Sequence, residues 1–375
     1  MARRPARRRG ARGLSLIELM VSMVLGLLLL AIVGQVYLLN KASFTAQEQQ
    51  GLLQESGRFA LEFLARDARM SGLVGCSSRR PLELPLPVRN YLNVTAYPFN
   101  VTQGVYGHEA DGSGVGDTLA LGATNPTADG GASDWTPALP TGTYSLVDSA
   151  LPGSDVLVLS GMDPGIPLVA PFTSGAQIFV ASTAGFARGD ILLVTDCQQA
   201  QVFQATNVVA ASGNITGSNA VATPGNASNI SERGPTGPFQ AGSEVARVRS
   251  YAYYVGRGAS DAPALFRESL QRTASGNADM QPEELIDGVE SMQVLYGIDG
   301  NHDYIVDAYV SADAVGDWQT VRALQVALLV RSRDDYTTTP DAGTHDVGGT
   351  LVDPVDDRRQ RRVFTSTIAL RNRLL

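Results

Sequence analysis

The sequence predicts an α+β protein in which one long N-terminal helix leads into a large, mostly antiparallel β domain. Three observations predict this class. Residues 14–36 form a nearly continuous apolar run, residues 37–72 place apolar side chains at helical spacing, and residues 73–375 contain short β-branched or aromatic runs bounded by Gly, Pro, Asn or Asp. The first two patterns are typical of helix, and the third is typical of strands joined by turns.

The apolar run is long enough to cross a membrane. Six arginines and no acid precede Gly13, and Glu18 is the single charge among the 23 residues from Leu14 to Val36. As a helix these residues span about 35 Å, and a hydrocarbon core is about 30 Å thick. Arginines at its start hold that end in the cytoplasm, so we expect the rest of the chain to be exported.

Two simpler interpretations of this segment compete. A secretory signal peptide has a shorter apolar core followed by a small-residue cleavage site, and the polar region around Ala46 does not provide one. A plain membrane anchor leaves Glu18 unexplained, because a carboxylate inside a membrane span is costly and usually has a partner.

Residues 37–72 are expected to continue the helix beyond the membrane. Ser71-Gly72 forms a stop, since Gly can adopt the left-handed cap. Gly51 and Gly57 would each weaken the helix by about 1 kcal/mol relative to Ala. The apolar face predicted to pack on the following domain consists of Leu52, Leu53, Phe59, Ala60, Phe63, Leu64 and Met70.

The remaining residues, 73–375, are expected to form strands and loops. Val326–Val330 is apolar throughout and is expected at the centre of a sheet. Residues 122–143 and 211–243 are rich in small and polar residues and are predicted to be surface loops. The predicted strands are Thr118–Leu121, Asp155–Ser160, Gln177–Ala181, Asp190–Thr195, Gln201–Val209, Glu244–Val255, Ala264–Leu270, Val289–Tyr296, Val321–Arg331 and Arg362–Arg371.

Charge and cysteine content bound the function. The formal net charge is −8, and removal of residues 1–13 with their six arginines lowers it to −14, which argues against general nucleic-acid binding. Cys76 and Cys197 both lie beyond the apolar run, on the side expected to be oxidising, and are predicted to form one disulfide. Closing this loop would contribute roughly 4–5 kcal/mol in the chain-entropy picture. Two buried thiols are the alternative.

One acidic segment carries oxygen ligands at alternate positions. Asp299, Asn301, Asp303 and Asp307 have the spacing that Ca²⁺ prefers, but Tyr304 replaces the turn glycine and Val310 the bidentate glutamate of an EF-hand loop. The alternative is an acidic hairpin loop between Leu295 and Tyr309. Calcium is the one cofactor that the sequence suggests.

Enzyme motifs are absent from the sequence, and no enzymatic activity is expected. The three histidines are scattered, and neither a GxSxG elbow nor a phosphate-binding loop occurs. One basic cluster lies outside the N-terminus, formed by Arg358, Arg359, Arg361 and Arg362. It either pairs with neighbouring acids or forms a docking patch for an acidic neighbour or for DNA.

The residues around Gly13 carry a resemblance. Residues 13–19, Gly-Leu-Ser-Leu-Ile-Glu-Leu, resemble the class III leader of type IV pilins and pseudopilins, although Leu14 stands where Phe is usual. The resemblance implies a type IV pilin-like fold and cleavage by a prepilin peptidase after Gly13. It also implies N-methylation of Leu14 and a role for Glu18 in filament assembly. Pairing of Glu18 with the new α-amine of a neighbouring subunit would cancel two charges in a low-dielectric setting.

Further segments are similar to the PilW family of minor pilins, namely residues 54–60, 64–72, 286–297 and 362–372. This resemblance implies an inner-membrane subunit that later joins a cell-surface pilus. Its partners would be other minor pilins, the major pilin and a large tip adhesin. Its roles would be priming of assembly, twitching motility and adhesion. The alternatives are a J-type pseudopilin of type II secretion and a membrane-anchored periplasmic binding module.

Overall fold

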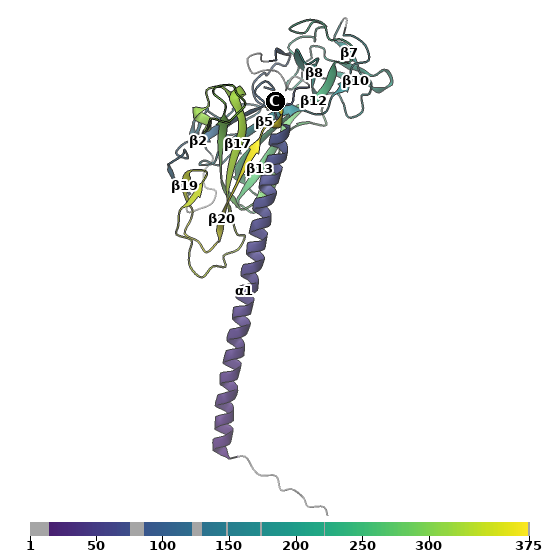
Figure 1. The fold of residues 1–375 in the computed structure, drawn as a ribbon. Coiled ribbons are helices and arrows are strands. Elements are labelled where there is room, and N and C mark those ends of the chain that lie inside the picture. Colours follow the sequence, from purple (N-terminus) through teal and green to yellow (C-terminus); the bar gives the residue numbers. More distant parts are fainter. Residues whose placement is uncertain are drawn as a thin grey trace, which may run out of the picture. The chain divides into compact units, whose positions relative to one another are not determined.

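The structure begins with one long helix, α1 (Leu16–Met70), as the sequence predicts. The computed structural model describes residues 15–75, 86–121, 130–147, 149–172, 175–220 and 222–373. By length and composition α1 can cross a membrane. The α+β fold class is therefore confirmed: a long apolar helix is followed by a large, mostly antiparallel β domain (Figure 1).

Residues 52–375 form one compact unit, which includes the last part of α1. Leu53, Ala60, Leu64 and Ala68 of α1 are buried in a core shared with the β domain. The expected packing face is wrong for Leu52, Phe59 and Met70, which are 47%, 44% and 41% exposed. A polar contact adds to this packing, because Asp67 Oδ2 accepts hydrogen bonds from the Tyr253 hydroxyl at 2.6 Å and from Arg267 at 3.1 Å. Burial of each large apolar side chain stabilises the fold by about 1.5–3 kcal/mol.

The C-terminal residues close the end of α1. Gly72 adopts φ +71°, the left-handed conformation expected after a helix. The Asn372 side-chain amide donates to the carbonyls of Ser71 at 3.0 Å and Arg69 at 3.4 Å. These are carbonyls that the helix itself leaves unpaired. The end of α1 and the C-terminal residues are thus joined by hydrogen bonds across 301 and 303 positions of sequence.

The largest sheet has ten strands in the order β1-β9-β8-β12-β5-β2-β4, and β6, β13 and β14 extend it through β12 and β13. All its pairings are antiparallel except β1–β9. Its strands are β1 (Val88–Asn90), β2 (Val105–Ala110), β4 (Trp135–Thr136), β5 (Val156–Met162), β6 (Ile166–Pro167), β8 (Ile191–Thr195), β9 (Ala200–Gln204), β12 (Glu244–Arg257), β13 (Pro263–Arg272) and β14 (Ala278–Asp287).

A second sheet has four antiparallel strands in the order β16-β15-β17-β20. Its strands are β15 (Val289–Ile298), β16 (Ala308–Val310), β17 (Val321–Arg331) and β20 (Arg361–Ala369). The apolar strand β17 lies between β15 and β20, so its predicted central position is confirmed. Figure 1 shows β17 and β20 running side by side.

The described part of the domain contains two further sheets of three strands, in the orders β10-β11-β7 and β18-β19-β3. Their strands are β3 (Thr118–Ala120), β7 (Gln177–Phe179), β10 (Asn207–Val209), β11 (Asn214–Thr216), β18 (His345–Val347) and β19 (Thr350–Asp353). The short 3₁₀ helices are η2 (Ala132–Asp134), η3 (Ala210–Ser212), η4 (Ala312–Ala314), η5 (Trp318–Thr320) and η6 (Arg371–Arg373).

The two segments expected to be surface loops contribute to the core, so that expectation is wrong for part of each. In the described part of residues 122–143, Trp135 is 1% exposed and its indole N–H donates to the Ser154 carbonyl at 2.9 Å. Within 211–243, Ile215, Ile230 and Phe239 are buried in an apolar cluster. In each segment a few isolated large apolar residues pack into the core. The surrounding sequence is rich in small and polar residues, so the composition of the segment does not indicate this burial.

Candidate functional site

Glu18 lies in the first turn of α1. Its carboxylate accepts a hydrogen bond from the Ser15 backbone N–H at 3.0 Å, and the Ser15 hydroxyl accepts one from Ile17 N–H at 3.3 Å. The two side chains thus satisfy N–H groups that a helix start otherwise leaves unpaired, as in a capping box, although the Ser15 hydroxyl binds the N–H of Ile17 and not that of Glu18. Glu18 therefore has a local structural role besides the expected assembly role. The expected cleavage residues, Gly13 and Leu14, lie outside the described residues.

The rest of this segment is apolar and exposed. Between Leu16 and Val36 the large side chains are each more than half exposed, for example Leu29 at 63% and Ile32 at 56%. An exposed apolar surface of this extent requires lipid or another protein to cover it. A single carboxylate at the start of such a surface is costly in lipid and usually has a partner there.

The acidic loop between β15 and β16 is a hairpin loop. Asp299 is fully buried, and its Oδ2 accepts from Arg322 Nε at 3.0 Å and from Tyr304 N–H at 3.0 Å. Arg322 also stacks over the Tyr304 ring at 4.7 Å. Although burial opposes ionisation, these hydrogen bonds and the Arg322 charge hold the pKa of Asp299 below its ordinary value.

The other oxygen groups of this loop mainly hold its own backbone. Asp303 Oδ1 accepts from Ile305 N–H at 2.8 Å, and Asp307 Oδ2 accepts from Gly300 N–H at 2.8 Å. Asn301 donates to Asp303 at 3.2 Å. The described residues contain no group of three or more His, Cys, Asp or Glu side chains placed to hold a metal ion. These contacts lend no support to calcium binding, which stays a prediction for Asp299, Asn301, Asp303 and Asp307.

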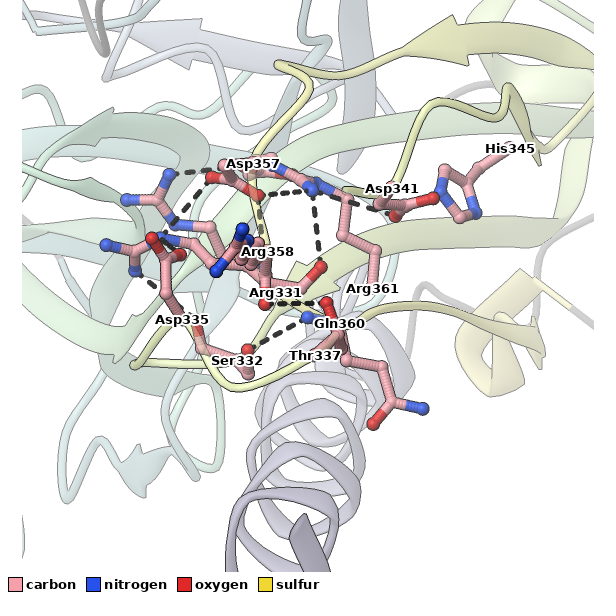
Figure 2. Close-up of polar contacts among 12 residues, drawn as sticks. Arg331, Ser332, Asp335, Thr337, Asp341, His345, Asp357, Arg358, Gln360 and Arg361 are labelled. Carbon is pink, nitrogen blue, oxygen red and sulfur yellow. Dashed lines mark hydrogen bonds and ion pairs between the residues drawn. The ribbon is translucent and has the colours of Figure 1, made fainter. Parts of the chain in front are cut away.

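The basic cluster is held largely by ion pairs within the domain. Arg361 is 6% exposed and binds Glu290 through Nε at 2.6 Å and Nη2 at 3.1 Å. Its Nη1 contacts Asp357 at 2.8 Å and Asp341 at 3.6 Å, and His345 contacts the same Asp341 at 3.0 Å (Figure 2). Burial alone would lower the pKa of Arg361, but the bonds and charges of Glu290 and Asp357 raise it. Arg358 and Arg362 remain exposed.

The predicted disulfide cannot be followed to both ends, because Cys76 lies outside the described residues. Cys197 lies between β8 and β9 with φ +71°. Gly75, which precedes Cys76, packs so closely on Thr195 that an added Cβ would lie 2.6 Å from the Thr195 methyl carbon. The chain before Cys76 thus runs beside the chain before Cys197, and the pairing stays a prediction.

Two buried carboxylates were not singled out from the sequence. Asp155 joins the two large sheets, since its Oδ1 accepts from Ala110 N–H at 3.0 Å and its Oδ2 from Val294 N–H at 2.8 Å. Burial and the neighbouring Glu109 raise the pKa of Asp155 above its ordinary range. Burial also raises the pKa of Glu109, to about 7. Both acids lie in strands or at strand ends among apolar residues, and no local pattern marks them.

These features define a class of protein. A long helix that is apolar in its first half, a carboxylate in its first turn and a large antiparallel β domain are together the architecture of a type IV pilin. Two protein-family models then narrow the class. Residues 8–34 match the prokaryotic N-terminal methylation motif, and residues 252–372, from within β12 to η6, match PilW, described as type IV pilus-assembly protein W.

The resemblance to PilW-type minor pilins is therefore confirmed over residues 252–372, and the pilin-type leader over residues 8–34, whereas the similar segments 54–60 and 64–72 lie outside both matches. The methylation-motif match includes Gly13, Leu14 and Glu18. The PilW match includes the acidic loop, the Glu290–Arg361 pair and the last strand, β20. No curated protein and no solved structure matches the chain.

Proposed function

We propose that this protein is a minor pilin that joins other minor pilins in a tip complex and primes assembly of a type IV pilus. The observation that carries the proposal is the presence of both matches in one chain, the methylation motif over residues 8–34 and PilW over residues 252–372. A methylation motif implies processing by a prepilin peptidase, and a pilus-assembly region implies contact with other pilins.

In this proposal the chain is first an inner-membrane protein with its arginine-rich end in the cytoplasm. The peptidase cleaves after Gly13, and the new amine of Leu14 is methylated. The β domain lies outside the membrane, where formation of the Cys76–Cys197 disulfide is favoured. The subunit then enters the pilus, where it contacts the major pilin and supports a large tip adhesin, and hence twitching and attachment.

Glu18 is the proposed assembly residue, and it has no catalytic role. Inside a bilayer its charge is costly, and pairing with the α-amine of a neighbouring subunit removes that cost. This pairing directs an incoming helix to a fixed axial register, because both charges must meet. The proposed function is structural throughout and includes no enzymatic activity.

The experiment that tests this role separates charge from helix capping. Glu18→Gln preserves the reach of the side chain and the acceptor used by Ser15, but it removes the charge. We expect Glu18→Gln to abolish pilus assembly as fully as Glu18→Ala, while the protein remains at a normal level in the membrane. Glu48→Gln, at an exposed position farther along α1, is the matched control and should leave assembly unchanged.

Normal piliation with Glu18→Ala would contradict the proposal and favour a membrane-anchored binding module, which has no use for the carboxylate. Loss of protein secretion with intact pili in a deletion strain would instead identify a pseudopilin of type II secretion.

A further inference from the structure

Strand β20 is the last strand of the four-stranded sheet, so one of its edges has no neighbouring strand in the described part of the chain. The strand is 9 residues long and pairs with β17 along its whole length without a register shift. A free strand edge presents unpaired N–H and C=O groups, on which a strand of another chain can pair. This edge is therefore a place where the sheet can accept an extended segment of another protein.

The pairing pattern shows which backbone groups of β20 lie at this edge. In an antiparallel ladder, alternate residues of a strand exchange hydrogen bonds with one neighbour, and the residues between them direct their backbone groups to the other side. Leu370 N–H donates to Arg322 O at 2.9 Å, and Ser332 N–H donates to Gln360 O at 2.7 Å. Since the register is unbroken between these two pairs, the even-numbered residues of β20 bond to β17.

The odd-numbered residues consequently direct their backbone groups to the free edge. These are chiefly Val363, Thr365 and Thr367, whose N–H and C=O groups bond to no residue that the structure describes. The side chains of Thr365 and Thr367 are exposed. Phe364 and Ile368 pack in the core that includes α1, so these contacts cover one face of the sheet and not its edge.

The other free edges are short or blocked. Apart from β14, the remaining edge strands in the described ranges have two or three residues each. β14 is 10 residues long, but its ladder with β13 has a register shift, Pro282 has no N–H, and Glu283 and Glu284 are exposed. Prolines, charges and bulges are the means by which edge strands avoid pairing with other chains. From Val363 to Ala369, β20 has none of them.

The charges at the two ends of this edge indicate the chemistry of the partner. Arg362 near the start of β20 and Arg371 just after its end are exposed, and no acidic residue lies between them. Neither arginine forms an ion pair with a residue in the described ranges. A second copy of β20 in full overlap would place arginine beside arginine, and like charges destabilise a strand pair. An acidic segment meets an opposite charge at both ends.

We propose that β20 accepts an extended acidic segment of another protein, which pairs with its free edge as an additional strand. The backbone of the segment bonds to Val363, Thr365 and Thr367, and carboxylates near its two ends pair with Arg362 and Arg371. β20 spans about 30 Å, so a segment of about nine residues covers it. This inference goes beyond the proposed pilin function, because a membrane-anchored binding module could use the same edge.

The test uses the full-length protein in detergent micelles and a synthetic peptide. The peptide has a central run of alternating threonine and valine, as long as β20, between a pair of aspartates at each end. Its binding is followed by fluorescence anisotropy, and we expect a Kd on the order of 0.1 mM. The same peptide with lysines in place of the aspartates should not bind. Hydrogen exchange resolved to single residues should show that the acidic peptide protects the amides of Val363, Thr365 and Thr367.

Two kinds of variant separate the backbone contacts from the charges. Thr365→Pro removes one N–H from the free edge and no bond to β17, and it should weaken binding at least about fivefold. Thr365→Val keeps the N–H and is the matched control, with unchanged affinity. Arg362→Gln and Arg371→Gln should each weaken binding by about twofold or more, and added salt should reduce the difference. Thermal unfolding confirms that each variant is folded, and the two arginine changes provide the test if Thr365→Pro is not.

Three results would each overturn the proposal: no binding of the acidic peptide, equal binding of the lysine peptide, or protection only of amides outside β20. Equal affinity of folded Thr365→Pro and Thr365→Val would also overturn it, because the free edge would then not be the site. The edge of β20 lies outside the assembly helix, so failure here is distinct from failure of the proposed pilin function.

Discussion

The ring of Phe364 on β20 occupies the space where a side chain at position 57 of α1 would stand. A Cβ built on Gly57 would lie 2.4 Å from ring atoms Cδ2 and Cε2 of Phe364. Phe364 also packs against the main core and stacks with Arg362, whose guanidinium carbon lies 5.6 Å from the ring centre. The Phe364 ring of β20 therefore packs directly against the α1 backbone at Gly57, where no side chain is present.

Gly57→Ala is predicted to destabilise the protein by about 1–3 kcal/mol, because overpacking outweighs the gain in helix propensity. The measurement is denaturant unfolding of the purified protein. Gly51→Ala, where no described atom lies within 4 Å, is the control and should gain up to about 1 kcal/mol. Adding Phe364→Leu to Gly57→Ala should recover part of the loss. Equal effects of the two alanines would show that the ring does not constrain α1.

The raised pKa of Glu109 predicts that the free energy of unfolding falls as the pH rises from 5 to 8. The pKa of Glu109 is raised by burial, and also by Asp313 and Asp117, to about 7 from an ordinary value of 4.5. The folded protein then binds more protons than the unfolded chain in this window, and its stability decreases with pH by up to about 3 kcal/mol. Asp155, whose pKa is also raised, acts in the same direction. Glu109→Gln should flatten the profile, whereas the exposed control Glu62→Gln should not. A flat profile in the unmodified protein would contradict this assignment.

Asp299→Ala is predicted to cost about 3–5 kcal/mol, because it leaves Arg322 buried without its carboxylate partner. The exposed Asp303→Ala, in the same loop, should cost about 1 kcal/mol. Since the pKa of Asp299 is lowered, its contribution to the free energy of unfolding is present above the ordinary pKa of 3.8 and is lost as the pH falls below it. Thermal unfolding of the two variants as a function of pH is the measurement.

Thermal unfolding of the unmodified protein in Ca²⁺ and in chelator tests the calcium prediction. A higher Tm in Ca²⁺ that Asp303→Ala removes would support it.

Arg361→Ala should be far more damaging than Arg362→Ala, although the two residues are adjacent. The first change removes Arg361 from the buried Glu290 carboxylate, which keeps its ion pair with Arg331 at 3.2 Å, at an expected cost of about 3–5 kcal/mol. The second removes an exposed guanidinium and should change stability by less than about 1 kcal/mol. Unfolding curves of both variants decide this. Normal stability but lost piliation in Arg362→Ala would indicate that the exposed part of the cluster is a docking patch.

Much of the architecture could be predicted from the sequence. The apolar run and the helical spacing after it predicted α1, and the β-branched run at 321–331 coincides with β17. Strand β14 was not predicted, because its outer half is polar and contains Pro282, as an edge strand allows. Strand β2 was missed because Gly107, His108 and Glu109 interrupt its apolar character.

The candidate sites were predictable where they depend on local sequence. The leader and Glu18 form a contiguous motif. Asp299, Arg361 and Asp155 each have a partner that lies 23, 71 and 139 positions away along the chain, respectively, and only the fold brings these pairs together.

The central claim is that this chain is a processed pilin, and intact mass tests it most directly. The protein is recovered from native membranes of strains with and without an active prepilin peptidase. The account predicts that the peptidase-containing strain yields a chain beginning at Leu14, with one added methyl group, and that the other strain retains residues 1–13. An intact Met1 end in both strains, or cleavage beyond Val36, would contradict it.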